Sequence, residues 1–478
     1  MKKLWQKNTQ MLDTFIETFE TKDDLLLDQK LIVYDVYGSL AHAKMLKKIG
    51  ILSAYELKLL TEGLKEILTL TEKNQFILEA GDEDIHTKIE NFLIEKYGDI
   101  GKKIHTGRSR NDQVLTALRL YSKDKLLAIW EDVMQLTESF QHFANKYESM
   151  AMPGFTHMQK AMPSTVGMWA SAFTEALLDD LTALKTAYEL NDQSPLGSAA
   201  GYGVPLPLDR QYTADLMGFA RVQINPIYSQ NSRGKIETQI IAALSAILID
   251  INKFATDVLF FTSSEINYFS VSENLYSGSS IMPQKKNVDV AELLRSKLHL
   301  LLGHYTQIMS LSSNLISGYN RDFQDSKKPF FESLDLTHDS IKATTLLINN
   351  LIPNKTKLES SLTSEIFATH QALELVSKGM PFRSAYQKVG NDLQHVEQKN
   401  IPELMLQSNH IGGTGNLMLE HFSKMLDTEK KHYQQVLKNF RTAVSVLVTE
   451  DIHKTTASID IKTNFPYNIQ NLILSRKN

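Results

Sequence analysis

Apolar residues recur every three or four positions along four long segments of this chain. The first spans about residues 112–147, the second follows Pro163, the third spans about 235–261, and the fourth follows Asn287. This spacing puts the apolar side chains on one face of a helix. The third segment is apolar on nearly all sides, as expected at the centre of a bundle or at a subunit interface. The pattern therefore predicts four long helices.

The length of these helices predicts the architecture. At a rise of about 1.5 Å per residue, the first helix would be roughly 50 Å long. Helices of that length cannot bury their apolar faces inside a small globule, so we expect an all-α protein whose elongated bundle associates with copies of itself. Shorter helical patterns flank the bundle. We divide the chain into an N-terminal helical domain (1–110), the central bundle (111–360) and a C-terminal helical domain with an extended tail (361–478).

Composition narrows the class of protein. The 478 residues carry a net charge of −4, which gives no general attraction to nucleic acid or to an anionic membrane. The chain has no cysteine, which excludes disulfides and thiolate metal sites and suits a reducing, cytoplasmic location. The most apolar helical stretch, residues 240–249, has half the roughly 20 residues that a membrane span needs.

The loop at residues 278–287 (GSSIMPQKKN) is the most informative segment for chemistry. Its glycine and serines predict a mobile connection between two helices, and Ser279 is a potential nucleophile or base. Lys285 and Asn287 supply donors where the loop enters the next helix, a position suited to anions. The combination favours a lid that completes a site when it closes.

Residues 107–112 (GRSRND) precede the first long helix. The simplest interpretation makes Asn111 or Asp112 the N-cap of that helix. Arg108, Ser109 and Arg110 also suit an anion site, because a guanidinium can bind a carboxylate at two points near a helix N-terminus. The two interpretations are compatible.

Thr156 and His157 lie between the first two long helices. A histidine can exchange a proton near neutral pH, and the threonine beside it can donate a hydrogen bond to a carboxylate. Taken alone, such a histidine is more often structural or at the surface. Its place at a bundle end, in a chain that also carries the 278–287 loop, favours a role in the chemistry.

Two further polar runs have ordinary structural interpretations. Residues 82–87 (DEDIHT) would by default be the acidic start of a helix. The acids and histidine also raise the idea of a metal site, but no second histidine lies one helical turn away, so we expect no metal. Residues 319–327 (YNRDFQDSK) mix charges with aromatic side chains at a helix break, which usually marks a solvated surface.

These segments together resemble one enzyme family. The 278–287 loop resembles the GSSxMPxKxN loop of the aspartase/fumarase lyase superfamily, and its PQKKN ending resembles the argininosuccinate lyases in particular. The runs at 105–114 (HTGRSRNDQV) and 82–86 (DEDIH) resemble the same family. The resemblance implies an enzyme that splits argininosuccinate reversibly into arginine and fumarate by β-elimination, without a cofactor or metal.

The resemblance also implies an assembly. Members of the family are homotetramers with a core of about twenty helices, and loops of three subunits meet at each active site. The present chain is consistent with that arrangement, because Asn111, His157 and Ser279 are separated by helices tens of ångströms long. One subunit is not expected to bring these three residues together.

Roles for individual residues follow from the same resemblance. Ser279 would be the base, Lys285 would stabilise its alkoxide, and His157 would act as proton shuttle or general acid. Asp84 would face the guanidinium side of the substrate, and Arg233 would lie near the fumarate half. The implied substrate-binding residues are Asp84, Ser109, Arg110, Asn111, Thr156, Arg233, Asn287, Tyr319, Gln324 and Lys327, of which the last three would hold the amino-acid end.

Several positions depart from the family pattern. An N-terminal WGGRF element is replaced by WQKNT at residues 5–9, and a serine near the substrate is replaced by Asp24 or a neighbour. Gly234 stands where the family usually has an acidic residue after the arginine, Val288 replaces a proline, and the C-terminus is longer than usual. The first two departures concern the arginine end of the substrate.

Two alternative functions remain open. The chain could be a sister lyase that acts on another N-substituted succinate; adenylosuccinate lyase and fumarase themselves differ at PQKKN and GRSRNDQ. It could also be a non-catalytic helical protein like the lens crystallins that arose from this family. The presence of Ser279, His157, Asp84, Lys285 and Asn287 disfavours the second alternative, since a protein retained for packing need not keep them.

Overall fold

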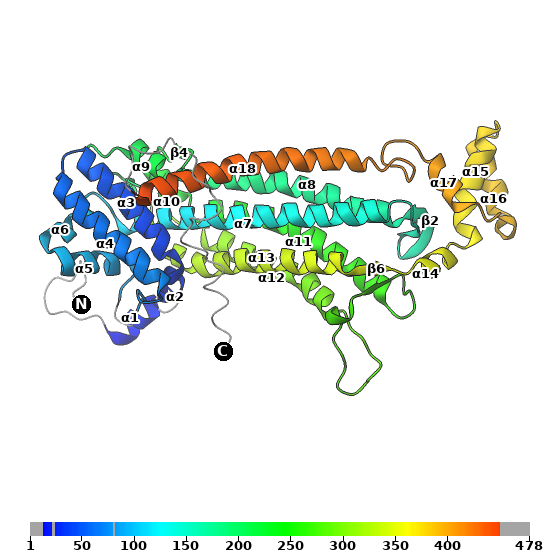
Figure 1. Ribbon diagram of the computed structural model, residues 1–478, viewed down its shortest axis with the longest axis horizontal. Helices are drawn as coiled ribbons and strands as arrows, with labels where there is room; N and C mark the ends of the chain where they lie inside the picture. Colours follow the sequence, from blue (N-terminus) through cyan, green and yellow to red (C-terminus); the bar gives the residue numbers. More distant parts are fainter. Residues whose placement is uncertain (1–12, 22–23, 80–81, 450–478) are drawn as a thin grey trace.

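Long helices run along the main axis of the molecule and define its shape (Figure 1). The structure is a computed structural model that describes residues 13–21, 24–79 and 82–449. Five helices form the central bundle: α7 (Arg110–Lys146), α8 (Val166–Asn191), α11 (Lys235–Thr262), α12 (Asp289–Leu311) and α13 (Lys327–Asn349). The all-α class and the four predicted long helices are confirmed.

The fifth bundle helix, α13, was not predicted from the pattern of apolar residues. Its buried face contains Ser333, Thr337, Ser340 and Thr344, which interrupt the apolar stripe. Each hydroxyl donates to the carbonyl four residues earlier, at 2.6–2.8 Å. Because these bonds satisfy the hydroxyls inside the helix, the polar face can be buried.

A group of shorter helices covers one end of the bundle. It contains α1 (Thr14–Thr21), α2 (Asp24–Asp28), α3 (Ile32–Lys48), α4 (Ala54–Glu72), α5 (Ile85–Tyr97) and α6 (Asp99–Lys102). The helix α3 is buried along most of its length and packs against α4 and α7. The short helices α9 (Arg210–Leu216) and α10 (Pro226–Asn231) lie at the same end (Figure 1).

The segment after residue 361 contains two groups of helices. The helices α15 (Ala368–Ser377), α16 (Phe382–Gly390) and α17 (Ile401–Gln407) share a small core at the far end, next to α14 (Lys355–Ser360). The helix α18 (Leu419–Thr449) instead returns along the bundle and packs against α7, α3 and α8 (Figure 1). Its apolar residues, such as Phe422 and Phe440, belong to the main core. Residues 5–9 and the extended tail lie outside the described residues.

The described part of the chain also contains three two-stranded sheets between its helices. The antiparallel hairpin of β1 (Ala151–Thr156) and β2 (Gln159–Thr165) lies between α7 and α8. The strands β3 (Gln193–Ser194) and β4 (Arg221–Val222) pair in parallel, and β5 (Phe269–Val271) pairs with β6 (Leu351–Pro353) in antiparallel fashion.

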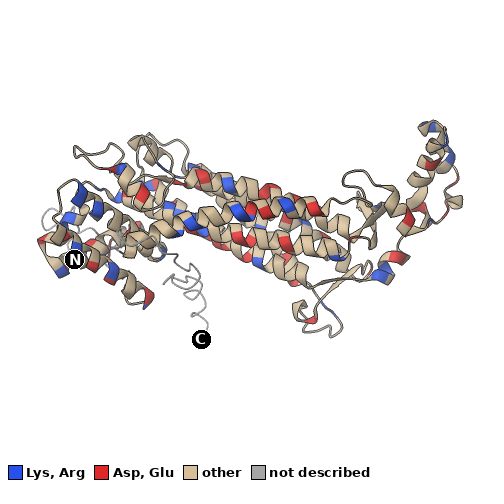
Figure 2. Ribbon diagram, turned by 45° about the horizontal axis from the view of Figure 1, so that its top comes forward, with Lys and Arg blue, Asp and Glu red and all other residues tan. Residues whose placement is uncertain are grey.

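Charge is mixed along the bundle. Acidic and basic residues are interspersed along its helices (Figure 2), which keeps the local field of either sign small. Within 13–21, 24–79 and 82–449, no helix combines the length and apolar character that a membrane crossing requires.

Candidate active site

A cavity of about 430 Å³ lies where the N-terminal helices meet the bundle. It is lined by α2, the first turn of α5, the N-termini of α7 and α11, and the segment before α13. These elements bring together many of the predicted substrate-binding residues: Asp84, Ser109, Arg110, Asn111, Arg233, Tyr319, Gln324 and Lys327. The lining carries acidic and basic groups in close pairs, so it suits a ligand with charges of both signs.

Asp84 and Arg110 form one side of the cavity. Asp84 is the N-cap of α5 and accepts a hydrogen bond from the Thr87 N–H at 2.8 Å. The Arg110 guanidinium contacts both Asp84 and Glu83. Burial by itself would raise the pKa of Asp84, but the nearby charges of His86 and Arg110 outweigh burial and hold that pKa below its usual range. Asp84 therefore presents a fixed negative charge.

The first turn of α7 is built around Ser109 and Asp112. Ser109, rather than the predicted Asn111 or Asp112, is the N-cap, and Asp112 accepts the Ser109 N–H at 2.9 Å from within the helix. The other oxygen of Asp112 accepts the N–H groups of Gly197 and Ala199, both at 2.9 Å. A single buried carboxylate thus ties the glycine-rich loop after α8 to the start of α7. Because its carboxylate binds this loop from inside the helix, Asp112 is not the N-cap residue of α7.

Arg233 and Tyr319 form a second side of the cavity. The Arg233 guanidinium lies 5.0 Å from the centre of the Tyr319 ring and donates to the Asn111 carbonyl at 2.6 Å. Gly234, which departs from the family pattern, has a φ of +71°, and a Cβ added there would collide with the Ser312 hydroxyl. A side chain at position 234 would therefore be strained by the backbone conformation and would require the Ser312 hydroxyl to move.

Lys327 forms the third side, between two acids. Its ammonium lies 2.5 Å from Asp24 and 2.8 Å from Asp28, and its side chain is 7 % exposed. Burial would lower the pKa of Lys327, but the charges of Asp28 and Asp24 outweigh burial and raise it. Burial raises the pKa of Asp24, against the opposing charge of Lys327. Asp24, which stands near the position where the family has a serine, thus places an additional acid beside Lys327.

The predicted Thr156 and His157 lie far from this cavity. They lie at the exposed tip of the β1–β2 hairpin, Thr156 as the last residue of β1 and His157 in the turn, with a φ of +53°. The hairpin follows the C-terminal end of α7, whereas Ser109 stands at its N-terminal end. Since α7 has 37 residues, about 55 Å separates the two positions.

The 278–287 loop is also remote from the cavity. It follows the C-terminal end of α11, whose 28 residues span about 42 Å from Arg233. The loop base is closed by paired backbone hydrogen bonds between Ser277 and Asn287, both at 2.9 Å. Within the loop, the Ser279 hydroxyl accepts the N–H of Met282 at 3.1 Å. Lys286 pairs with Glu273 at 2.6 Å, whereas Lys285 is exposed.

Within one chain, the predicted site residues therefore lie in two places: the cavity at one end of the bundle and two loops toward the other end. Two cavity-lining residues that were not predicted are Glu237 and Arg321, whereas Arg108 belongs to the anion site expected before α7. Glu237 is 2 % exposed and lies in the first turn of α11, one helical turn after Arg233. An acid at that spacing from a candidate arginine is a signal that the sequence contained.

Among the described residues, no cluster of three His, Asp or Glu side chains is arranged to hold a metal ion.

Comparison with known proteins identifies the family. A lyase family model matches residues 7–303. The argininosuccinate lyase of Thermotoga neapolitana is 47% identical over 387 residues, which cover 81% of this chain and 97% of that protein. The argininosuccinate lyase of Parabacteroides distasonis is 40% identical over 424 residues, or 89% and 94% of the two chains. The chain belongs to the argininosuccinate lyase family. The resemblance inferred from the three sequence segments is confirmed.

Solved structures show that this member of the argininosuccinate lyase family has the fold of its wider superfamily. An EDDS lyase in complex with formate matches with a TM-score of 0.78 and 21% identity, over 94% of this chain and 98% of that one. The class II fumarase of Schistosoma mansoni matches with a TM-score of 0.67 and 16% identity, over 85% and 91%.

Proposed function

We propose that this chain is an argininosuccinate lyase that converts argininosuccinate reversibly into L-arginine and fumarate, with Ser279 as the base. The observation that carries the proposal is the cavity, where Arg110, Arg233 and Lys327 are interleaved with Asp24 and Asp84. Argininosuccinate carries carboxylates at both ends and a guanidinium between them, so it needs paired charges of both signs. Family membership supports the same substrate.

The elimination needs cations more than it needs a cofactor. The proton is removed from a carbon next to a carboxylate, so negative charge accumulates on that carboxylate as an aci-carboxylate. Fixed donors around it stabilise this charge. Lys285, Asn287 and Thr156 have suitable donor groups, and Arg233 supplies a buried guanidinium at the cavity.

Ser279 removes the proton in this proposal. A serine hydroxyl is a weak base in water, so its alkoxide requires stabilisation. The Met282 N–H already points at the Ser279 hydroxyl, and Lys285 belongs to the same loop. Closure of the loop over the substrate would exclude water and strengthen both interactions. His157 passes a proton to the leaving guanidino nitrogen, directly or through a relay.

A homotetramer completes the active site. About 55 Å of α7 separates Ser109 from the β1–β2 hairpin, and about 42 Å of α11 separates Arg233 from the 278–287 loop, which supports a site whose cavity receives His157 and Ser279 from other subunits. Exposed apolar residues on α12, such as Leu293, Leu300 and Met309, supply a surface for that association. Five bundle helices from each of four chains make a core of about twenty helices. The cysteine-free composition supports a cytoplasmic location.

Fumarate absorbance tests the proposal directly. Argininosuccinate, adenylosuccinate and aspartate are supplied separately to the purified tetramer, and turnover of argininosuccinate alone is expected. Turnover of another N-substituted succinate instead would identify a sister lyase. Turnover of none by a correctly assembled tetramer would favour a crystallin-like protein.

Mixed tetramers test the shared site. The variants Ser279→Ala and Lys327→Met each inactivate one part of the site. Tetramers reassembled from both variants should regain part of the activity, because some sites receive an intact cavity from one subunit and an intact loop from another. Reassembled mixed tetramers without any regain would contradict the shared arrangement.

A further inference from the structure

The helix α3 carries three polar side chains on one face, although it is buried along most of its length. Asp35, Ser39 and His42 follow each other at spacings of four and three residues, and each is at most 3 % exposed. A buried polar group is costly unless a partner satisfies it. All three have partners, and these include the two segments that bring Asp84 and Arg108 to the cavity.

The first partner is His86, in the first turn of α5. Its Nδ1 contacts the Asp35 carboxylate, and its side chain is 2 % exposed. Burial by itself would lower the pKa of His86, but Asp35 and the charge of Asp84 outweigh burial and raise it. His86 therefore keeps its proton at a pH where an exposed histidine begins to lose it. Its charge is one of the two that hold the pKa of Asp84 below its usual range.

The charges around His86 come from several elements. Asp35 approaches from α3, Asp84 from the N-cap of α5, and Asp28 from the end of α2, and Asp35 has the largest effect of the three. The other titratable neighbour is His105, before α7. Burial and nearby cations lower the pKa of His105 to about 4, so His105 is neutral above that pH. Asp35 is therefore the main reason why His86 is charged.

The second partner of α3 is Arg108, which lines the cavity. The Arg108 guanidinium donates to the Ser39 hydroxyl at 2.9 Å, and the hydroxyl donates to Asp35 at 3.4 Å. One turn further along α3, the His42 Nε2 donates to the Thr106 carbonyl at 2.8 Å and holds the same segment. The Asp35 carboxylate thus stands at the meeting point of two branches, one toward an acid and one toward a cation of the cavity.

We propose that Asp35 is a positioning residue of the active site, which orients Asp84 through His86 and Arg108 through Ser39. The cavity lining, in the described part of the chain, includes Asp84 and Arg108 but not Asp35, Ser39 or His86. Asp35 therefore acts on a ligand only through other groups. It fixes one negative and one positive group for a ligand that carries both signs of charge. The inference rests on the proposed function, since it assigns Asp35 a part in argininosuccinate cleavage.

The variant Asp35→Asn separates the charge of this residue from its packing, because asparagine has the same size and still accepts a hydrogen bond. Its kcat/KM for argininosuccinate should fall about tenfold or more, since Asp84 is then less well held. The acid limb of the kcat/KM profile should move to higher pH, because a neutral His86 no longer favours ionised Asp84. His86→Gln should move the limb equally, and the double variant no further.

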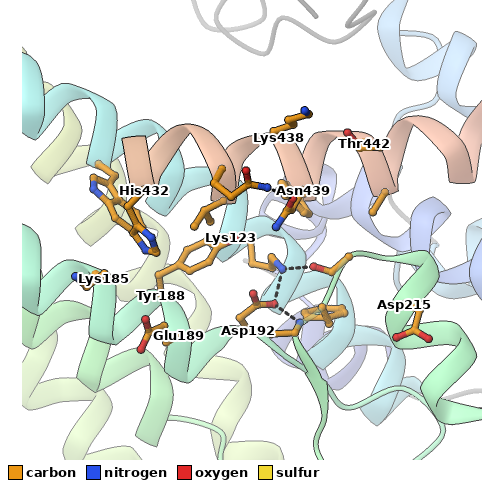
Figure 3. Close-up of a pocket in the computed structure, with 18 residues that line it drawn as sticks. Lys123, Lys185, Tyr188, Glu189, Asp192, Asp215, His432, Lys438, Asn439 and Thr442 are labelled. Carbon is orange, nitrogen blue, oxygen red and sulfur yellow. Dashed lines mark hydrogen bonds and ion pairs between the residues drawn. The ribbon is translucent and has the colours of Figure 1, made fainter. Parts of the chain in front are cut away.

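Two other variants show what a purely structural effect looks like. Ser39→Ala should raise KM through the Arg108 branch and leave the acid limb unchanged. The matched control is Asp192→Asn, which removes the acid of another buried pair, with Lys123 on the side of the bundle under α18 (Figure 3). This control should lose stability and keep the acid limb of the wild type. An Asp35→Asn enzyme whose acid limb stays with that of the control would overturn the inference.

Urea unfolding tests the Asp35–His86 pair without any substrate. The pKa of His86 is raised in the folded state, so its contribution to stability is complete below the unfolded value of about 6.5 and is lost as the pH rises through the folded value. Asp35→Asn and His86→Gln should both lack this loss, whereas the wild type and Asp192→Asn should show it. Equal loss in the wild type and Asp35→Asn would overturn the inference. Unfolding is measured without turnover, so its failure is distinct from failure of the proposed lyase activity.

Discussion

Replacing Lys327 by methionine tests how the candidate site is held together. The substitution removes the single cation between Asp24 and Asp28 but keeps a side chain of similar length. Removing one partner of a buried ion pair typically costs about 3–5 kcal/mol, because the remaining charge stays buried. An acid can escape that cost by taking up a proton. At pH 7 this costs about 4 kcal/mol for a carboxyl with an ordinary pKa near 4, so the expected loss of unfolding free energy is about 3–4 kcal/mol.

The unfolding free energy that Lys327→Met loses should become smaller as the pH falls. Burial already raises the pKa of Asp24 in the presence of the lysine, and loss of the lysine raises it further. A carboxyl whose pKa is higher in the folded state than in the unfolded state destabilises the fold at neutral pH, and this penalty declines as the pH falls toward the unfolded value of about 4. The deficit of Lys327→Met should therefore shrink by up to about 1.4 kcal/mol per pH unit below neutrality.

Urea unfolding at fixed protein concentration, at pH 7, 6 and 5, measures this deficit. The matched control is Lys342→Met, the same substitution at an exposed position of the same helix. Adding Asp24→Asn to Lys327→Met should recover part of the lost free energy, since it removes one of the two unpaired charges. A Lys327→Met protein within about 1 kcal/mol of wild type at pH 7, or a deficit independent of pH, would refute the reasoning.

Three further predictions concern other parts of the site. Ser279→Ala should keep the circular dichroism spectrum and abolish fumarate formation; an active variant would mean that another group is the base. Gly234→Asp, which restores the acid usual in the family, should lower the unfolding free energy by about 2 kcal/mol or more, and Ser312→Gly should recover part of the loss. Burial and the Arg108 charge lower the pKa of His105 to about 4, so the wild type should lose stability as the pH falls from about 6.5 to 4. The loss should be smaller in His105→Gln, and equal acid sensitivity of the two proteins would contradict this assignment.

Local sequence determined the helices and the short segments that carry the chemistry. The regular spacing of apolar residues predicted α7, α8, α11 and α12, because apolar residues three or four positions apart form one helix face that is buried. The same reasoning missed α13, whose buried stripe of serine and threonine is satisfied by bonds inside the helix. It also misplaced the cap of α7, since local preference cannot show that Asp112 is needed by a loop 85 residues away.

Only the tertiary structure decided which charges meet. Lys327 and Asp28 are 299 residues apart in sequence, and neither shows by its neighbours that the other will neutralise it. The sequence by itself also contained the lengths of the helices, and therefore the distance between the two ends of the bundle. Long-range packing decided at which end of the bundle the cavity lies, and it decided that α18 returns along the bundle. The spacing of apolar residues shows which face of a helix is buried. The element that packs against that face is decided by the rest of the chain.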